Sequence, residues 1–169
     1  MTKNQRPVVS IIAIDFRESG IFILLQERKK TRDDTPYNGY LELPQGKINS
    51  NESIDDAARR ELAEETGLTI EKYWIGEPKD WKDSHETSEL TVFNPLVCVA
   101  DKIQNHIGIA IAITVKGEIR DTPEAIGHRW YHISEIQKLM IEKRIFPLNV
   151  PMLSALTEIQ EELTNKWGN

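Results

Sequence analysis

Three glutamates lie close together at positions 61, 64 and 65, and their spacing suits the binding of a metal ion. On a helix, residues three and four positions apart lie above one another, so the carboxylates of Glu61, Glu64 and Glu65 would crowd together. Like charges at this spacing destabilise a bare helix, whereas a cluster of hard oxygen ligands is what Mg²⁺ or Mn²⁺ binds. The spacing therefore predicts a divalent-cation site. Arg60 precedes it and could pair with Glu64, Asp56 or Glu52.

The segment that carries these glutamates is predicted to be a helix from about Ile54 to Thr66. Ser53 suits its N-terminal cap, and Asp56 stands three positions later as the partner in a capping box. Gly67 can adopt the left-handed conformation that ends a helix. A narrow apolar strip for packing against a sheet is formed by Ala57, Ala58 and Leu62.

The stretch from Gly46 to Leu68 resembles the signature of the Nudix hydrolases. That signature is Gly, five residues, Glu, seven residues, Arg-Glu, an apolar residue, any residue, Glu-Glu, any residue, Gly and an apolar residue. At ordinary residue frequencies, a chance match in a chain of 169 residues is on the order of one in ten million. A solvated acidic helix face would explain neither the glycines nor the spacing. The matching positions are Gly46, Glu52, Arg60, Glu61, Leu62, Glu64, Glu65, Gly67 and Leu68.

The resemblance implies a role for each charged residue of this stretch. Glu61, Glu64 and Glu65 would bind Mg²⁺ or Mn²⁺. The carbonyl of Gly46 would be a further ligand, since a residue without a Cβ allows a close approach. Arg60 would orient Glu61 or Glu64 through a charge-assisted hydrogen bond.

A catalytic acid is also expected in the loop from Lys116 to Gly127. In similar proteins an acidic residue about six positions before a tryptophan completes the site, and Glu124 stands at that distance from Trp130. Glu118 and Asp121 are weaker candidates in the same loop. One carboxylate must accept the proton of the attacking water. Glu64 and Glu124 are both candidates, and the sequence does not choose between them.

Substrate contacts are less sharply defined. Arg28 leaves a strand toward the loop before the signature, where similar proteins often use an arginine to contact phosphate. Tyr40 and its neighbour Tyr37 could stack on a nucleobase, and Trp81 is another possible platform. Each of these aromatic residues could instead pack against the protein, and the basic run around Arg28 could be a solvated turn.

Composition excludes several other classes of protein. A net charge of −6 argues against a general binder of duplex DNA or of a membrane surface, which would show a basic excess. One cysteine allows no internal disulfide. The apolar run at 107–115 is too short to span a bilayer, and the polar N-terminus is not a signal peptide, so we expect a cytoplasmic protein.

The remaining elements alternate between strands and helices. Gly76 to Glu89 is polar and is predicted to be a loop or an irregular hairpin. The expected strands are 8–15 and 21–27, which form a hairpin, followed by 69–75, 90–100, 107–115 and 129–133. The expected later helices are 134–144 and 151–165.

This order predicts an α+β protein in which helices cover a central sheet. The resemblance sharpens the expectation to the Nudix fold, an α/β/α sandwich around a mixed β-sheet, in one domain at 1–169 with a core at about 7–163. It implies a pyrophosphohydrolase that cleaves the diphosphate bond of a nucleoside diphosphate linked to another moiety, by attack of metal-activated water on phosphorus. The alternative is a non-catalytic Nudix domain that binds a nucleotide as a sensor or regulator. The sequence leaves a homodimer open.

Overall fold

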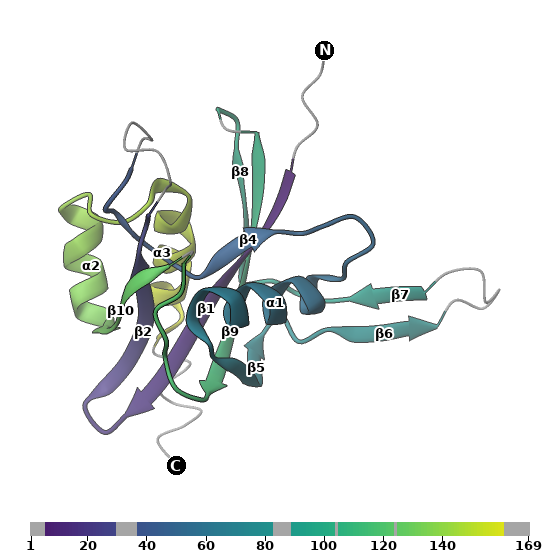
Figure 1. Ribbon diagram of the computed structural model, residues 1–169, viewed down its shortest axis with the longest axis horizontal. Helices are drawn as coiled ribbons and strands as arrows, with labels where there is room; N and C mark the ends of the chain where they lie inside the picture. The colour runs from purple at the N-terminus through teal and green to yellow at the C-terminus, as the bar shows by residue number, and fades with distance from the viewer. Residues whose placement is uncertain (1–5, 30–36, 83–88, 104, 124, 161–169) are drawn as a thin grey trace.

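Helices cover both faces of a central sheet in the computed structural model, which describes residues 6–29, 37–82, 89–103, 105–123 and 125–160 (Figure 1). β1 runs parallel to β9, and the other pairs of the sheet are antiparallel, which makes the sheet mixed. The predicted α/β/α arrangement is therefore confirmed. The main strands, in sheet order, are β10 (Ile126–His132), β2 (Gly20–Glu27), β1 (Arg6–Arg17), β9 (His106–Lys116) and β5 (Thr69–Ile75).

Three short strands extend this sheet. β3 (Leu41–Glu42) pairs with β2, β4 (Gln45–Lys47) pairs with β1, and β8 (Val97–Asp101) pairs with β9. β4 matters most for the site, because its pairing fixes Gly46 opposite Val9 of the central strand.

A separate two-stranded hairpin leaves the body of the protein (Figure 1). It consists of β6 (Lys79–Lys82) and β7 (Glu89–Val92), and it forms its own small sheet. The stretch from Gly76 to Glu89 was expected to be a loop or an irregular hairpin. Its described part contains β6 and the first residue of β7, which pair as a hairpin, and residues 83–88 lie outside the described part of the chain. The strand expected at 90–100 is wrong as one unit, because β7 belongs to the hairpin and β8 to the central sheet.

One helix lies on one face of the sheet and two lie on the other. α1 (Ile54–Thr66) has the predicted bounds. The opposite face carries α2 (Ile133–Ile141), a short 3₁₀ helix η1 (Pro147–Asn149) and α3 (Val150–Glu158). The last helix was expected to reach residue 165, but residues 161–169 lie outside the described part of the chain.

Alternating residues of β1 supply both hydrophobic cores. Ile12 and Ile14 pack into the core beneath α2 and α3. Val9, Ile11 and Ala13 pack into the core beneath α1. Because both faces of the strand are buried, its sequence is almost continuously apolar. Within the described ranges, no helix has the length and apolar character needed to cross a membrane.

Candidate metal and catalytic site

The first turn and the last residue of α1 fix the direction of its acidic face. Ser53 Oγ accepts a hydrogen bond from the Asp56 N–H, and Asp56 reaches back to the Ser53 N–H, which confirms the predicted capping box. Gly67 ends the helix with a φ of 75°, in the left-handed region. The predicted apolar strip is confirmed, since Ala57, Ala58 and Leu62 are fully buried against the sheet.

Glu61 packs directly on the backbone of Gly46. A Cβ placed on Gly46 would lie 1.8 Å from Glu61 Cδ, so no other residue fits here while Glu61 keeps its position. This contact is a reason for a glycine at position 46 that is independent of the predicted approach of its carbonyl to a metal ion. The contact joins α1 to β4, and Glu61 is 8% exposed.

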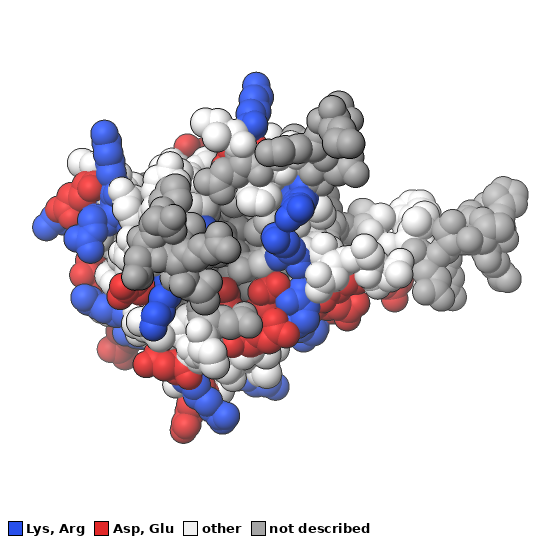
Figure 2. All heavy atoms as spheres, turned by 45° about the horizontal axis from the view of Figure 1, so that its top comes forward, with Lys and Arg blue, Asp and Glu red and all other residues white. Residues whose placement is uncertain are grey.

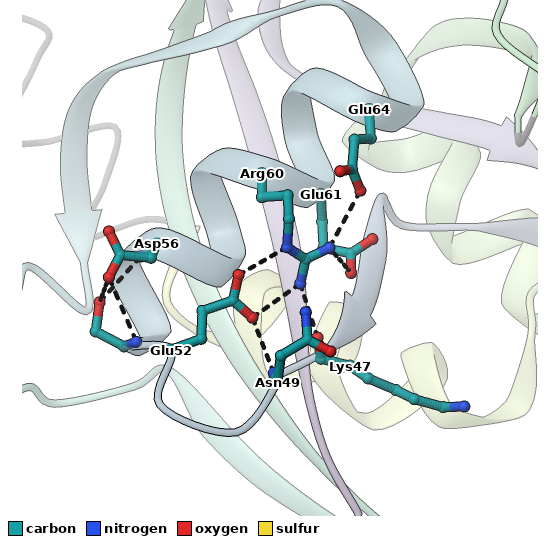
Figure 3. A network of polar contacts seen from close by, with 8 residues as sticks. Lys47, Asn49, Glu52, Asp56, Arg60, Glu61 and Glu64 are labelled. Carbon is teal, nitrogen blue, oxygen red and sulfur yellow. Dashed lines mark hydrogen bonds and ion pairs between the residues drawn. The ribbon is translucent and has the colours of Figure 1, made fainter.

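Arg60 lies at the centre of a network that holds two of the three glutamates (Figure 3). Its Nη1 donates to Glu61 Oε1 at 2.6 Å and to Glu64 Oε2 at 3.1 Å. Its Nη2 donates to the carbonyl of Lys47 at 2.9 Å. The planar guanidinium therefore ties the two carboxylates to β4, which is the orienting position that the sequence predicted.

Glu52 holds the other side of this guanidinium. Arg60 Nε and Nη2 donate to its two carboxylate oxygens at 2.7 and 2.9 Å, a bidentate pair. The N–H of Asn49 donates to the same carboxylate at 2.8 Å. The hydrogen bond from Arg60, followed by that from Asn49, lowers the pKa of Glu52 to about 2. Glu52 thus acts on Arg60 rather than on the glutamate cluster.

Glu65 has a different environment, because it is buried between α1 and the sheet. Gln26 Nε2 donates to Glu65 Oε2 at 2.8 Å, and the N–H of Gln45 donates to the same oxygen at 2.9 Å. Burial raises the pKa of Glu65 to about 8, and the nearby carboxylates of Glu42 and Glu61 raise it further against these hydrogen bonds. A buried carboxylate with acidic neighbours favours a bound proton or a bound cation.

A buried polar cluster behind Glu65 was not predicted from the sequence. The Gln45 side chain accepts from Ser10 Oγ at 3.0 Å and from Asn149 Nδ2 at 2.8 Å, and it donates to Glu42 at 3.2 Å. Asn149 Oδ1 accepts from the N–H of Leu43 at 3.1 Å. The sequence indicates only that these polar residues need partners, since they interrupt apolar strands or precede an apolar helix, and it does not identify those partners.

The donor set suits a hard divalent cation, although its atoms are not gathered around one point. Within the described ranges, no group of three His, Cys, Asp or Glu side chains is arranged to hold a metal ion. Arg60 turns Glu61 and Glu64 toward itself, while Glu65 faces Gln26 and Gln45. In favour of a cation, Gln26 Oε1 is buried without a hydrogen-bond partner in the described part of the chain, beside a carboxylate of raised pKa. Carboxylate and amide oxygens of this kind are the ligands that hard divalent cations such as Mg²⁺ prefer.

Arg28 and Tyr40 lie on the side of the cluster that Glu42 lines. Arg28 forms an ion pair with Glu42, and its guanidinium carbon lies 3.9 Å from the centre of the Phe146 ring. Tyr37 contacts both Tyr40 and Phe146 edge-on, at 5.4 and 5.7 Å between ring centres. Ring contacts thus link Tyr40, Tyr37 and Phe146, and Arg28 joins Phe146 to Glu42.

In the described part of the chain, neither Trp81 nor Asp121, two other predicted site residues, takes part in the hydrogen bonds of this cluster. Trp81 lies on β6, in the hairpin that projects from the body, and is 60% exposed. Asp121 Oδ1 lies 3.2 Å from Nδ1 of His128. Glu124, the predicted loop acid, lies outside the described residues.

Comparison with known proteins gives the family. A model of the NUDIX domain matches residues 4–149, and the chain therefore belongs to the Nudix family. A curated relative, the RNA pyrophosphohydrolase of Bartonella henselae, is 40% identical over 84 residues, which cover 40% of this chain and 49% of the relative. The chain thus spans about half the length of this relative. The family model and the relative thus establish membership of the Nudix family, whose hydrolases generally use divalent cations.

Solved structures agree on the fold. The MutT protein from Methanosarcina mazei matches with a TM-score of 0.63 and 22% identity, over 94% of this chain and 96% of that chain. The NUDIX domain of Shewanella oneidensis NrtR, solved with ADP ribose, matches with a TM-score of 0.60 and 13% identity, over 92% and 88% of the two chains. At these identities the likeness establishes the Nudix fold alone.

Proposed function

We propose that this chain is a Mg²⁺- or Mn²⁺-dependent pyrophosphohydrolase that cleaves the diphosphate bond of a nucleoside diphosphate linked to another moiety. The observation that carries the proposal is the setting of Glu65. This carboxylate is buried beside Glu61 and Glu42 and has a pKa raised to about 8, so at neutral pH it is stabilised by binding either a proton or a cation.

Glu61, Glu64, Glu65 and the Gly46 carbonyl would hold the cation. When bound, the cation would neutralise charge on the diphosphate and lower the pKa of a coordinated water. Arg60 contributes by position, because it anchors Glu61 and Glu64 to Glu52 and to the Lys47 carbonyl. Its guanidinium makes five hydrogen bonds within the described part of the chain, so we assign it to the carboxylates rather than to substrate phosphate.

The proton of the attacking water must pass to a carboxylate, and two remain candidates. Glu64 is the most accessible of the three helix glutamates, with 47% of its side chain exposed. An exposed carboxylate can reach a water molecule at the substrate, which supports Glu64. Glu124 is supported by its place in the sequence before Trp130.

The nucleoside end of the substrate would lie on the side of Arg28 and Tyr40. Tyr37 and Phe146 line a hollow of about 440 Å³ together with residues of the β8–β9 connection. Arg28 lies against Phe146 and next to Glu42, between this hollow and the carboxylate cluster. A planar base stacked beside Tyr37 or Tyr40, with its diphosphate near Arg28, would place the scissile bond toward Glu64. Rotation of Arg28 away from Glu42 would be required.

A hydrolysis screen tests the proposal. Candidate substrates are ADP-ribose, diadenosine polyphosphates, NADH, nucleotide sugars, oxidised nucleoside triphosphates and, in view of the Bartonella relative, an RNA with a 5′-triphosphate. Mg²⁺-dependent release of a nucleoside monophosphate or of pyrophosphate, abolished in Glu64→Gln, is the expected result. Binding of a nucleotide with no turnover in Mg²⁺ or Mn²⁺ would instead identify a nucleotide sensor.

A further inference from the structure

One face of the β6–β7 hairpin is apolar and faces solvent. Trp81 pairs with Leu90, and Lys79 pairs with Val92, so these four residues share one face of the ribbon. Trp81 is 60% exposed, and Leu90 and Val92 are each 48% exposed. A two-stranded ribbon is marginally stable by itself in water, and an exposed apolar face rimmed by polar residues indicates a contact surface.

A hollow of about 510 Å³ lies where the hairpin joins the body, at the N-terminus of α1. Its apolar lining includes Ile54, Phe93 and Ile111, and its rim includes Asp55 and Asp56. Figure 2 shows acidic side chains gathered beside the root of the hairpin. The hollow therefore combines an apolar floor with an acidic edge.

The hairpin cannot fill this hollow with its own apolar face. Thr91 lines the hollow, and Thr91 pairs with Asp80, so the Asp80–Thr91 face is turned toward it. Trp81 and Leu90 stand on the opposite face of the same ribbon. The apolar face and the apolar hollow of one chain thus point in different directions, and a second molecule is needed to join them.

We propose that two copies of this chain form a symmetric dimer through their β6–β7 hairpins, here called arms. The arm of each copy places its apolar face in the hollow of the other copy. In a two-fold dimer each contact forms twice, so one arm and one hollow per chain are sufficient. The two Trp81 side chains, each 60% exposed, would together bury roughly 200–300 Å², and the exposed parts of Leu90 and Val92 from both copies would add to this area.

The charges on the two surfaces are also complementary. Lys79 stands on the apolar face of the arm, and in the described part of the chain it forms no ion pair. On the rim, Asp55 is paired with Arg59. Asp56, by contrast, bonds Ser53 and forms no ion pair with any described residue. Docking brings this lysine of one copy to this carboxylate of the other, whereas nucleic acid would meet an acidic rim.

Sedimentation velocity over a dilution series tests the proposal. We expect the wild-type chain to dimerise reversibly between about 1 and 200 µM, the range in which interfaces of modest size dissociate. Trp81→Ser removes the largest apolar side chain from the arm, and Thr91→Arg places a long side chain in the hollow. Each substitution should raise the dissociation constant of the dimer roughly 100-fold or more. Circular dichroism would verify that both variants, altered only at exposed positions, remain folded.

The matched control is Ile141→Ser on α2, which removes an equally conspicuous apolar side chain, 82% exposed, away from both surfaces. This variant should dimerise like the wild type. A wild-type chain that stays monomeric over the whole range, or a Trp81→Ser variant that still dimerises, would overturn the proposal. Loss of the dimer in Trp81→Ser but not in Thr91→Arg would place the arm outside the hollow and would overturn the exchange.

Discussion

The Glu61 carboxylate occupies the space in which a side chain at position 46 would begin, 1.8 Å from the position of its Cβ. Gly46 does not have a positive φ, so its backbone conformation is open to any residue. The glycine is required by the approach of Glu61 and not by the turn. The Glu61 carboxylate can lie against β4 in this way only because position 46 has no side chain.

Gly46→Ala should therefore leave the protein folded and remove most of its activity. The atoms that clash belong to the end of a flexible side chain, so Glu61 can swing away at small cost. A displacement of about 1 Å at a catalytic site can cost roughly 10²-fold in rate. Steady-state kinetics with Mg²⁺ measure this loss, and kcat should fall by at least that factor.

Gly67→Ala is the control for this substitution. Gly67 has a φ of 75°, so alanine there should destabilise the fold by about 1 kcal/mol while kcat stays near the wild-type value. Wild-type kcat in Gly46→Ala would show that the position of Glu61 does not matter for turnover.

Arg60→Lys should lower kcat far more than it changes KM. Arg60 contacts Glu52, Glu61 and Glu64 in one plane, and an ammonium group cannot reproduce that geometry. Loss of an orienting contact reduces the rate of the chemical step, whereas loss of a substrate contact weakens binding. An unchanged kcat with a much higher KM would place Arg60 on the substrate instead.

The metal-free protein should become less stable as the pH rises from about 4.5 to about 8. Burial raises the folded-state pKa of Glu65 from 4.5 to about 8, so over this range the folded state binds a proton that the unfolded state has released. This contribution, on the order of a few kcal/mol, is present below pH 4.5 and is lost as the pH rises through the folded-state pKa. Urea unfolding in EDTA at a series of pH values measures it.

Glu65→Gln should remove most of this pH dependence, since glutamine does not titrate. Glu52, whose pKa is lowered, contributes in the opposite sense, and its stabilisation disappears only as the pH falls from about 4.5 through about 2. The two effects are therefore separated in pH. If Glu65→Gln retained the wild-type loss of stability between pH 4.5 and 8, the protonation of Glu65 would not be its cause.

The two candidate bases differ in what their removal does to metal binding. Glu124→Gln should lower kcat by about 10²- to 10⁴-fold, the usual contribution of a positioned proton acceptor, and should flatten the acid limb of the pH–rate profile. Mg²⁺ affinity should change little, because the three helix carboxylates remain. Glu64→Gln should reduce both kcat and Mg²⁺ affinity. Nearly full activity in Glu124→Gln would leave the proton to Glu64.

Local spacing was sufficient to predict α1, its caps and its acidic face. The bonds that define these features join residues at most four positions apart, such as Ser53 with Asp56 or Arg60 with Glu64. The pairing of Arg60 with Glu52 was one of three possibilities in the sequence, and all three partners lie within eight positions.

The cluster behind Glu65 could not be predicted in the same way. Gln45 meets Asn149 across 104 positions of the sequence and Ser10 across 35, and only the completed sheet brings them together. Arg28 was expected to be available to phosphate, and its ion pair with Glu42 depends on the pairing of β2 with β3. No short-range pattern carries this information.

Gln45 has one more consequence, for the way in which the protein unfolds. Its backbone N–H holds Glu65 under α1, while its side chain holds Asn149 at the start of α3, on the other face of the sheet. If the α1 layer or the α3 layer detached from the sheet, buried polar groups in the remaining layer would lose their hydrogen-bond partners. The two layers should therefore open as one cooperative unit, and the slowly exchanging amides of β1 should report a single opening free energy for both faces.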